Sequence, residues 1–225
     1  MTLAINSSTG YSGSTASVSL TLSTTVANCI IGVAYADNGY PNTGSITDTA
    51  GLTYTFRAAA NGGGSQPIEF YYAKASSILT GNVITINYSS STFVDACAFA
   101  ISGANFTTPF DSNVGLPYTA SSGTVTGVST TNANDMLLSF YRQSSNSSPT
   151  VGSGFTSIYN PAGEYFIAQY QIVSSTQSGL SVGIGGGTTN TDANGGIVDA
   201  IQQAASTFNP AWALGSNRVF AGGPH

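Results

Sequence analysis

Charge is the property that this sequence lacks most. Charged residues make up only 6% of its 225 residues, against about a quarter in an ordinary globular domain. Four residues are basic and nine are acidic, so the net charge is −5. Proteins bind nucleic acids and anionic membrane surfaces through clustered lysine and arginine side chains, which this sequence does not have. We therefore expect no nucleic-acid partner.

Long apolar runs and a leader pattern are also missing. No apolar stretch reaches the roughly 20 residues that a membrane-spanning helix needs, so we expect no membrane insertion. Residues 1–8 (MTLAINSS) have neither the basic start nor the apolar centre of a signal peptide. If the protein leaves the cell, we expect another route, such as release with a particle.

Histidine and cysteine are almost absent. The single histidine, His225, is the last residue, and the two cysteines, Cys29 and Cys97, are far apart. Nucleophilic catalysis usually needs a positioned histidine base, and zinc needs clustered ligands, so we expect no catalytic residue, no metal and no cofactor. Both cysteines lie in apolar segments, where a free thiol acts as a small hydrophobic side chain. A disulfide between them, or between two chains in an oxidising environment, is the alternative.

Carboxylates are few, and two of them resemble an acid pair. Glu69 and Glu164 each begin an aromatic-rich segment, EFYY and EYF, and a glycosidase needs two carboxylates across a cleft. The alternative is that each lies at a strand edge or pairs with an arginine, because surface carboxylates are the ordinary case.

Two kinds of loop could hold an ion. Asp37-Asn38 and Asp192-x-Asn194 lie in glycine-rich turns and could supply oxygen ligands for calcium. We favour turns in which these side chains bond their own backbone. Gly183–Gly187 has the glycine content of a phosphate loop, but no helical pattern follows it, so it predicts close backbone packing instead.

What the sequence does contain is a series of strand patterns. Hydrophobic residues make up 41% of the chain, enough for a core. Apolar and hydroxyl residues alternate over 17–23, whereas 29–35 and 136–141 are continuous apolar runs. Glycine-, asparagine- and proline-rich turns separate the strands, and no helical stripe occurs. The remaining predicted strands are 52–56, 68–73, 83–88, 96–101, 125–128, 155–159, 165–173, 180–184 and 197–201. This pattern predicts an all-β, two-sheet antiparallel β-sandwich, jelly-roll-like in connectivity.

A weak internal repeat accompanies the strands. TTVAN (24–28) and TTNAN (130–134) each precede a buried strand, and AGLT (50–53) corresponds to SGFT (153–156). We interpret residues 1–204 as one sandwich domain built from half-units of approximately 1–120 and 121–204. Chance matches in a sequence rich in serine, threonine and glycine are the alternative.

The C-terminal segment departs from the strand pattern. Residues 205–225 contain the only tryptophan, and Pro210 and Pro224 oppose strand continuation. Phe208, Trp212 and Phe220 would be costly to leave in water. The segment therefore either folds back over the sandwich or forms an arm whose aromatic side chains bind a neighbouring subunit.

Several segments resemble a known family. DTAGLTYT (48–55), SGANFTTPFDSN (102–113) and QYQIVSSTQSGLSV (169–182) resemble a bacterial and phage β-sandwich family. The resemblance covers roughly residues 14–204; the relatives are repeats in large bacterial surface proteins and virion proteins of tailed phages and prophages. It implies the fold but no shared catalytic residues. Because this copy has no attached enzyme or anchor module, we expect a virion protein.

The sequence therefore predicts a non-enzymatic structural protein on the virion surface, as a capsid decoration or a tail fibre or spike component. Its partners would be copies of itself, neighbouring virion proteins and, in a host-binding role, surface glycans. The alternative is a carbohydrate-binding module or adhesin, which would expose a row of tyrosine or tryptophan side chains. A glycoside-cleaving enzyme would instead need two carboxylates within about 5–10 Å.

Overall fold

The computed structural model describes residues 2–38, 45–61, 67–143, 148–185 and 193–205. Thirteen strands and no helix occur in these ranges, so the predicted all-β sandwich is confirmed. The described ranges accordingly contain no helix that could cross a membrane. The predicted C-terminal arm, with Phe208, Trp212 and Phe220, lies outside the described residues.

The strands form three hydrogen-bonded sheets. The first has the spatial order β1-β6-β2-β5-β4, with β3 attached to β6; the second has the order β10-β11-β9-β13-β7; the third pairs β12 with β8. The strands are β1 (Ala4–Leu22), β2 (Cys29–Asp37), β3 (Ile46–Asp48), β4 (Thr55–Ala60), β5 (Ile68–Ala75), β6 (Asn82–Ser102), β7 (Tyr118–Ala120), β8 (Thr124–Gly127), β9 (Met136–Gln143), β10 (Thr156–Tyr159), β11 (Phe166–Ile172), β12 (Gly179–Gly183) and β13 (Ala193–Ile201).

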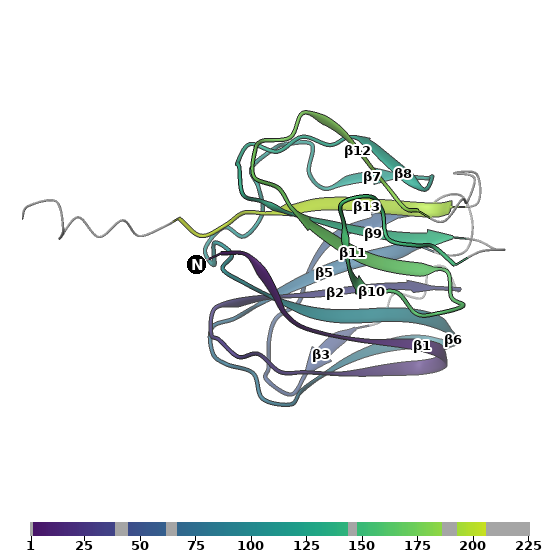
Figure 1. The fold of residues 1–225 in the computed structure, drawn as a ribbon. Helices are drawn as coiled ribbons and strands as arrows, with labels where there is room; N and C mark the ends of the chain where they lie inside the picture. The colour runs from purple at the N-terminus through teal and green to yellow at the C-terminus, as the bar shows by residue number, and fades with distance from the viewer. Residues whose placement is uncertain (1, 39–44, 62–66, 144–147, 186–192, 206–225) are drawn as a thin grey trace, which may run out of the picture.

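The three sheets form four layers, because one part of the first sheet packs against the rest of that sheet (Figure 1). Strands β1 and β6 pair along almost their whole length, and their register shifts between Thr15 and Ser17. Past this shift, residues 17–22 of β1 pair with 82–87 of β6, and β3 adds to them. This part packs against the rest of the first sheet as an outer layer. The second sheet covers the opposite face of the first, and β8 with β12 covers the second sheet in turn.

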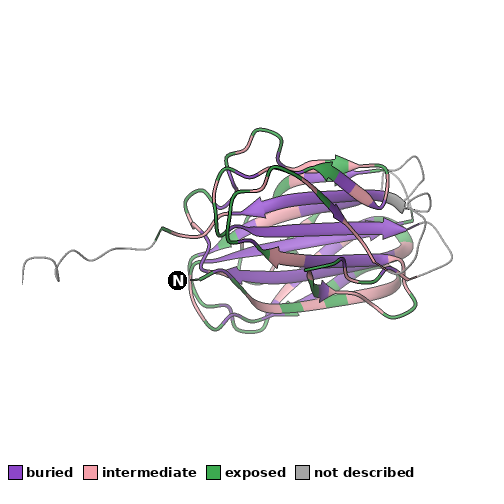
Figure 2. Cartoon of the chain, turned by 45° about the horizontal axis from the view of Figure 1, so that its top comes forward, coloured by how far each residue is buried: buried purple, intermediate pink, exposed green. Residues whose placement is uncertain are grey.

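The two central layers are buried on both faces. Along β2, Ile30 and Ala34 pack toward the second sheet, whereas Ile31 and Val33 pack toward the outer layer. Every residue of β2 and of β9 is buried, as the continuous purple strands of Figure 2 illustrate. A strand covered on both sides needs apolar side chains at successive positions. The apolar runs 29–35 and 136–141 are therefore confirmed as buried strands.

Several strand boundaries differ from the prediction. The segments 83–88 and 96–101, predicted as two strands, are one strand, because the chain stays extended through the bend of β6. The alternation predicted β1 only from residue 17, yet the strand begins at Ala4. Its first part is an edge strand with no fully buried residue between Ala4 and Ser17, and only Ile5 and Tyr11 pack against the core, so no apolar alternation marks it in the sequence.

Similar local arrangements occur at the two positions that the repeat aligns. Thr24 exchanges two hydrogen bonds with the backbone of Leu79, and Thr130 does the same with Gln177. Asn28 and Asn134, which precede β2 and β9, have φ values of 57° and 61°, in the left-handed region that asparagine tolerates. The jelly-roll-like connectivity and the half-units stay predictions; β7, which joins the second sheet, already lies before residue 121.

Candidate functional sites

The two carboxylates predicted as an acid pair lie in different parts of the fold. Glu69 is in β5 of the first sheet and faces the outer layer, since its cross-strand neighbour Tyr35 belongs to that core. Glu164 lies in the turn before β11 of the second sheet. Their surroundings also differ: Glu69 accepts a hydrogen bond from a tyrosine hydroxyl, whereas the charge of Glu164 contributes to raising the pKa of Asp95, mainly caused by burial.

Glu69 is held by two tyrosines. The hydroxyls of Tyr35 and Tyr71 donate hydrogen bonds of 2.6 and 2.8 Å to Oε2 of Glu69. The two rings stack with centroids 6.0 Å apart, and Tyr88 packs edge-on against Tyr35. Burial, together with the Glu69 carboxylate, raises the pKa of Tyr71 to about 12. The phenols therefore stay protonated at neutral pH and act as donors that fix the carboxylate.

A buried ion pair joins the two central sheets at one end. The guanidinium of Arg142 in β9 binds the carboxylate of Asp95 in β6, and these side chains are 1% and 0% exposed. A second guanidinium nitrogen donates to Oδ1 of Asn38 at 3.2 Å. Asn38, from a predicted calcium turn, therefore uses its amide oxygen to bind an arginine. Asp192 of the other predicted turn lies outside the described residues.

A second ion pair joins the sheets near the opposite edge. Nε and Nη2 of Arg57 in β4 donate to the two carboxylate oxygens of Asp199 in β13, at 2.7 and 3.1 Å. The Arg57 guanidinium also lies 4.1 Å from the centroid of the Phe110 ring. Its side chain is 23% exposed, so this pair is less isolated from water than the Asp95–Arg142 pair.

Two further carboxyl groups, Asp111 and Asp135, form a site that sequence patterns did not single out. Oδ2 of Asp111 accepts hydrogen bonds from backbone and side-chain donors of Thr131 and Asn132, all between 2.8 and 2.9 Å. Burial alone would raise the pKa of Asp111, but these bonds and one from the Asn113 backbone outweigh it, and the pKa is lowered. Asp111 is therefore a buried anion that is stabilised by hydrogen bonds from protein groups.

Asp135, directly before β9, is the unusual member of this pair. It is fully buried, and no N–H or O–H group of a neighbouring residue reaches either carboxyl oxygen. Burial and the adjacent Asp111 raise its pKa to about 8. With its pKa raised to about 8, the Asp135 carboxyl group is mostly protonated at neutral pH, beside the ionised Asp111. One sequence signal could have drawn attention to Asp135. In the internal repeat it aligns with Cys29, so an acidic residue stands where the other copy begins its buried strand.

Neither cysteine forms a disulfide bond. Cys29 and Cys97 are free and buried. Cys97 lies opposite Ala34, five residues along β2 from Cys29, which is about 17 Å in a strand. They also belong to different core clusters, on opposite faces of the first sheet, so a disulfide between them is excluded. Burial raises the pKa of Cys97 to about 12, which keeps the thiol protonated.

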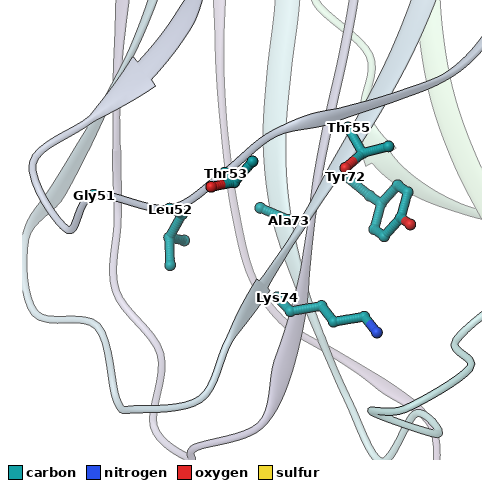
Figure 3. Close-up of a pocket in the computed structure, with 7 residues that line it drawn as sticks. All are labelled: Gly51, Leu52, Thr53, Thr55, Tyr72, Ala73 and Lys74. Carbon is teal, nitrogen blue, oxygen red and sulfur yellow. The ribbon is translucent and has the colours of Figure 1, made fainter.

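A groove opens where β4 separates from β5 (Figure 3). The two strands pair as far as Thr55 and Tyr72; before Thr55 the chain no longer pairs with β5, and a volume of about 350 Å³ lies between them. Tyr72 and Lys74 extend from β5, and Thr53 and Thr55 add hydroxyls. The groove is lined by Gly51, Leu52, Thr53, Thr55, Tyr72, Ala73 and Lys74. None of these side chains is acidic, so the groove itself supplies no pair of carboxylates for glycoside cleavage.

The remaining predicted features are distributed over the fold. Among the described residues, no three histidine, cysteine, aspartate or glutamate side chains are grouped to hold a metal ion. No described tyrosine is fully exposed; the one strongly exposed aromatic side chain in the described ranges is Phe56, at 53%. Gly183 ends β12, and Gly185 bridges to Thr150 of a neighbouring segment, in agreement with close backbone packing.

Comparisons with known proteins found no family model, no curated protein and no solved structure that matches the chain, so the resemblance to phage and bacterial β-sandwich proteins stays a prediction.

Proposed function

We propose that this chain is a non-enzymatic structural protein displayed on the surface of a phage particle, as a capsid decoration or as part of a tail fibre or spike. Its partners are other copies of itself and neighbouring virion proteins. The resemblance of its sequence motifs to those of virion β-sandwich proteins supports the location on a phage particle, and the distribution of charge in the fold supports the structural role.

The observation that carries the proposal is where the charges lie. Six of the nine acidic residues are buried: Asp37, Glu69, Asp95, Asp111, Asp135 and Asp199. Two of the four basic residues, Arg57 and Arg142, are bound to these acids. Most of the few charges of the chain are thus used inside the fold, and the described surface carries mainly hydroxyl, amide and glycine groups. Such a surface lets copies pack closely without like-charge repulsion.

Three of the buried acid groups also have structural partners that account for them. Asp95 and Asp199 connect the two central sheets through arginines, and Glu69 accepts hydrogen bonds from two tyrosines. A general acid or base must instead reach a substrate proton within hydrogen-bond distance. This use of the carboxylates supports a structural protein over a glycoside-cleaving enzyme.

Mass spectrometry of purified particles from the source of the sequence tests the proposal. We expect peptides of this chain to co-purify with the major capsid protein through a density gradient and to stay bound after a high-salt wash, because a neutral interface does not depend on screened charges. An abundant cytoplasmic protein of the host is the matched control for carry-over. Absence of the chain from intact particles contradicts the proposal.

A second candidate function is glycan binding, and the groove beside β5 favours it. Tyr72 offers an apolar ring and a hydroxyl, and Thr53 and Thr55 offer further hydroxyls. The exposed Lys74 amine donates a hydrogen bond of 2.7 Å to the Thr107 carbonyl. Sugars are bound by such combinations of aromatic and hydrogen-bonding side chains. This role is compatible with display on a particle, since a surface protein of a virion can bind host glycans.

A glycan array probed with the purified chain tests this second candidate. If the groove binds sugar, Tyr72→Ala is expected to weaken binding to any positive glycan by about tenfold, in line with about 1 kcal/mol or more for a lost aromatic contact. Ile172→Ser, an exposed apolar position away from the groove, serves as the control and should bind normally. An array without positive glycans removes this candidate.

A further inference from the structure

The four edge strands of the two central sheets differ greatly in length. An edge strand leaves backbone donors and acceptors without partners in its own sheet, so its length decides how much of another strand it can bind. In the described part of the chain, β4, β7 and β10 have 6, 3 and 4 residues. The pairing of β4 and of β10 also contains a register shift. In contrast, β1 has 19 residues and forms the fourth edge.

The edge formed by β1 lacks the usual protection against pairing. Natural edge strands carry lysine, proline, inward charges or bulges that prevent another strand from adding. Strand β1 (Ala4–Leu22) contains no charged residue and no proline. Its register with β6 shifts only next to Ile5 and next to Thr15, so the pairing is regular between these two points.

The uncovered part of this edge can be defined further. Asn6 and Ser7 are bonded by side-chain and backbone groups of the segment 23–25, which covers the start of the strand. The segment Ser8–Thr15 follows, and none of its residues is buried, whereas Val94–Ile101 of its neighbour β6 is entirely buried. Eight successive residues therefore pair with β6 on one side only, while one face of the segment packs at Gly10 against Tyr159 of β10. The segment is longer than an average strand of about five or six residues.

We infer that Ser8–Thr15 of β1 pairs with the same segment of a second copy of this chain, in antiparallel orientation about a two-fold axis. The first sheet then continues from one copy into the other. A two-fold axis brings a strand against itself only in the antiparallel direction, and most protein dimers have this symmetry. Backbone hydrogen bonds supply the affinity, as in other cases of strand addition.

The composition of the segment explains why the partner is a copy. Ser8–Thr15 reads STGYSGST, so in any antiparallel register only serine, threonine, glycine and tyrosine residues face each other across the axis. No register brings like charges together, which is the usual obstacle to self-pairing. The inference names the partner within an assembly and in that sense rests on the proposed function, although the pairing itself is a property of the isolated chain.

Lysines placed on the edge test the inference. In Ser8→Lys/Ser14→Lys, two exposed hydroxyls become like charges that meet in or near each paired segment. The control, Ser174→Lys/Thr176→Lys, adds the same charge at exposed positions between β11 and β12. Sedimentation velocity of the full chain over a wide concentration range is expected to show a dimer for the natural chain and the control. The dissociation constant of the dimer should rise about tenfold or more in the edge variant.

Hydrogen exchange locates the interface independently. Backbone amides within 8–15 should become more protected as the concentration of the natural chain rises, whereas in the edge variant their exchange should not depend on concentration. A natural chain that stays monomeric at high concentration overturns the inference, as does a dimer in which residues 8–15 exchange freely. Failure here leaves particle association intact, and absence from particles leaves the pairing intact, so the two proposals fail separately.

Discussion

Replacing Asp95 with alanine is expected to lower the free energy of unfolding by about 3–5 kcal/mol, the usual cost of breaking a buried ion pair. The loss is large because Arg142 is 1% exposed and lies between the two central sheets, where water cannot replace the carboxylate. Chemical denaturation followed by far-ultraviolet circular dichroism measures the change, since the whole chain loses its strand signal when it unfolds.

Two further variants separate the charge effect from lost packing. Asp199→Ala breaks the other ion pair, but Arg57 is 23% exposed and can turn toward water, so we expect a smaller loss. The double variant Asp95→Leu/Arg142→Met removes both charges and should recover most of the stability, because a buried pair can be replaced by apolar side chains at little cost. The explanation fails if the double variant is as unstable as Asp95→Ala.

The Asp135→Asn variant is expected to be more stable than the natural protein at pH 9 and close to it at pH 5. The pKa of Asp135 is raised to about 8 in the folded protein, whereas an unfolded aspartate titrates near about 3.9. Folding therefore takes up a proton between these values, and the stabilising contribution of the protonated form is lost as the pH rises through 8. Asparagine has nearly the same shape as aspartate and does not titrate in this range, so the variant removes this dependence on pH.

The expected difference at pH 9 is about 3 kcal/mol, as an order of magnitude for a shift of several pKa units. Denaturation curves of both proteins from pH 5 to 9 measure it. Asp111→Asn is the matched contrast. The pKa of Asp111 is lowered in the natural protein, so its carboxylate stabilises the fold at pH values above the ordinary aspartate pKa, and that contribution is lost as the pH falls. We expect Asp111→Asn to be destabilised at neutral pH. Parallel pH profiles for Asp135→Asn and the natural protein would sink this explanation.

The class of fold could be predicted because burial leaves a strong imprint on strand composition. The runs 29–35 and 136–141 are apolar at successive positions because each strand is covered on both faces. The alternation from 17 to 23 reflects a strand with one covered face. The first part of β1 was missed because an edge strand of serine, threonine and glycine has no face that demands apolar residues.

The polar sites could not be predicted in the same way. Asp95 and Arg142 are 47 residues apart in sequence, and Arg57 and Asp199 are 142 apart. Their meeting depends on how two sheets align face to face, which local patterns do not specify. Glu69 and Glu164 share an aromatic-rich setting, yet the register of β5 turns Glu69 toward Tyr35. Residue type identified Glu69 and Glu164 as candidates, and only the tertiary structure distinguished their partners.

The outermost layer formed by β8 and β12 has a consequence for how the molecule opens. These strands have four and five residues and pair only with each other. Two-stranded ribbons are marginal in water, so the pair depends on the small cluster in which Val125 and Val182 meet Tyr141 and Ile167. Its departure exposes that cluster and breaks the hydrogen bonds of Tyr141 to Val182 and of Gln169 to Gly183, while the strand pairing of the other layers stays intact. Thermal fluctuation should therefore peel this ribbon away well before the cooperative melting of the central sheets.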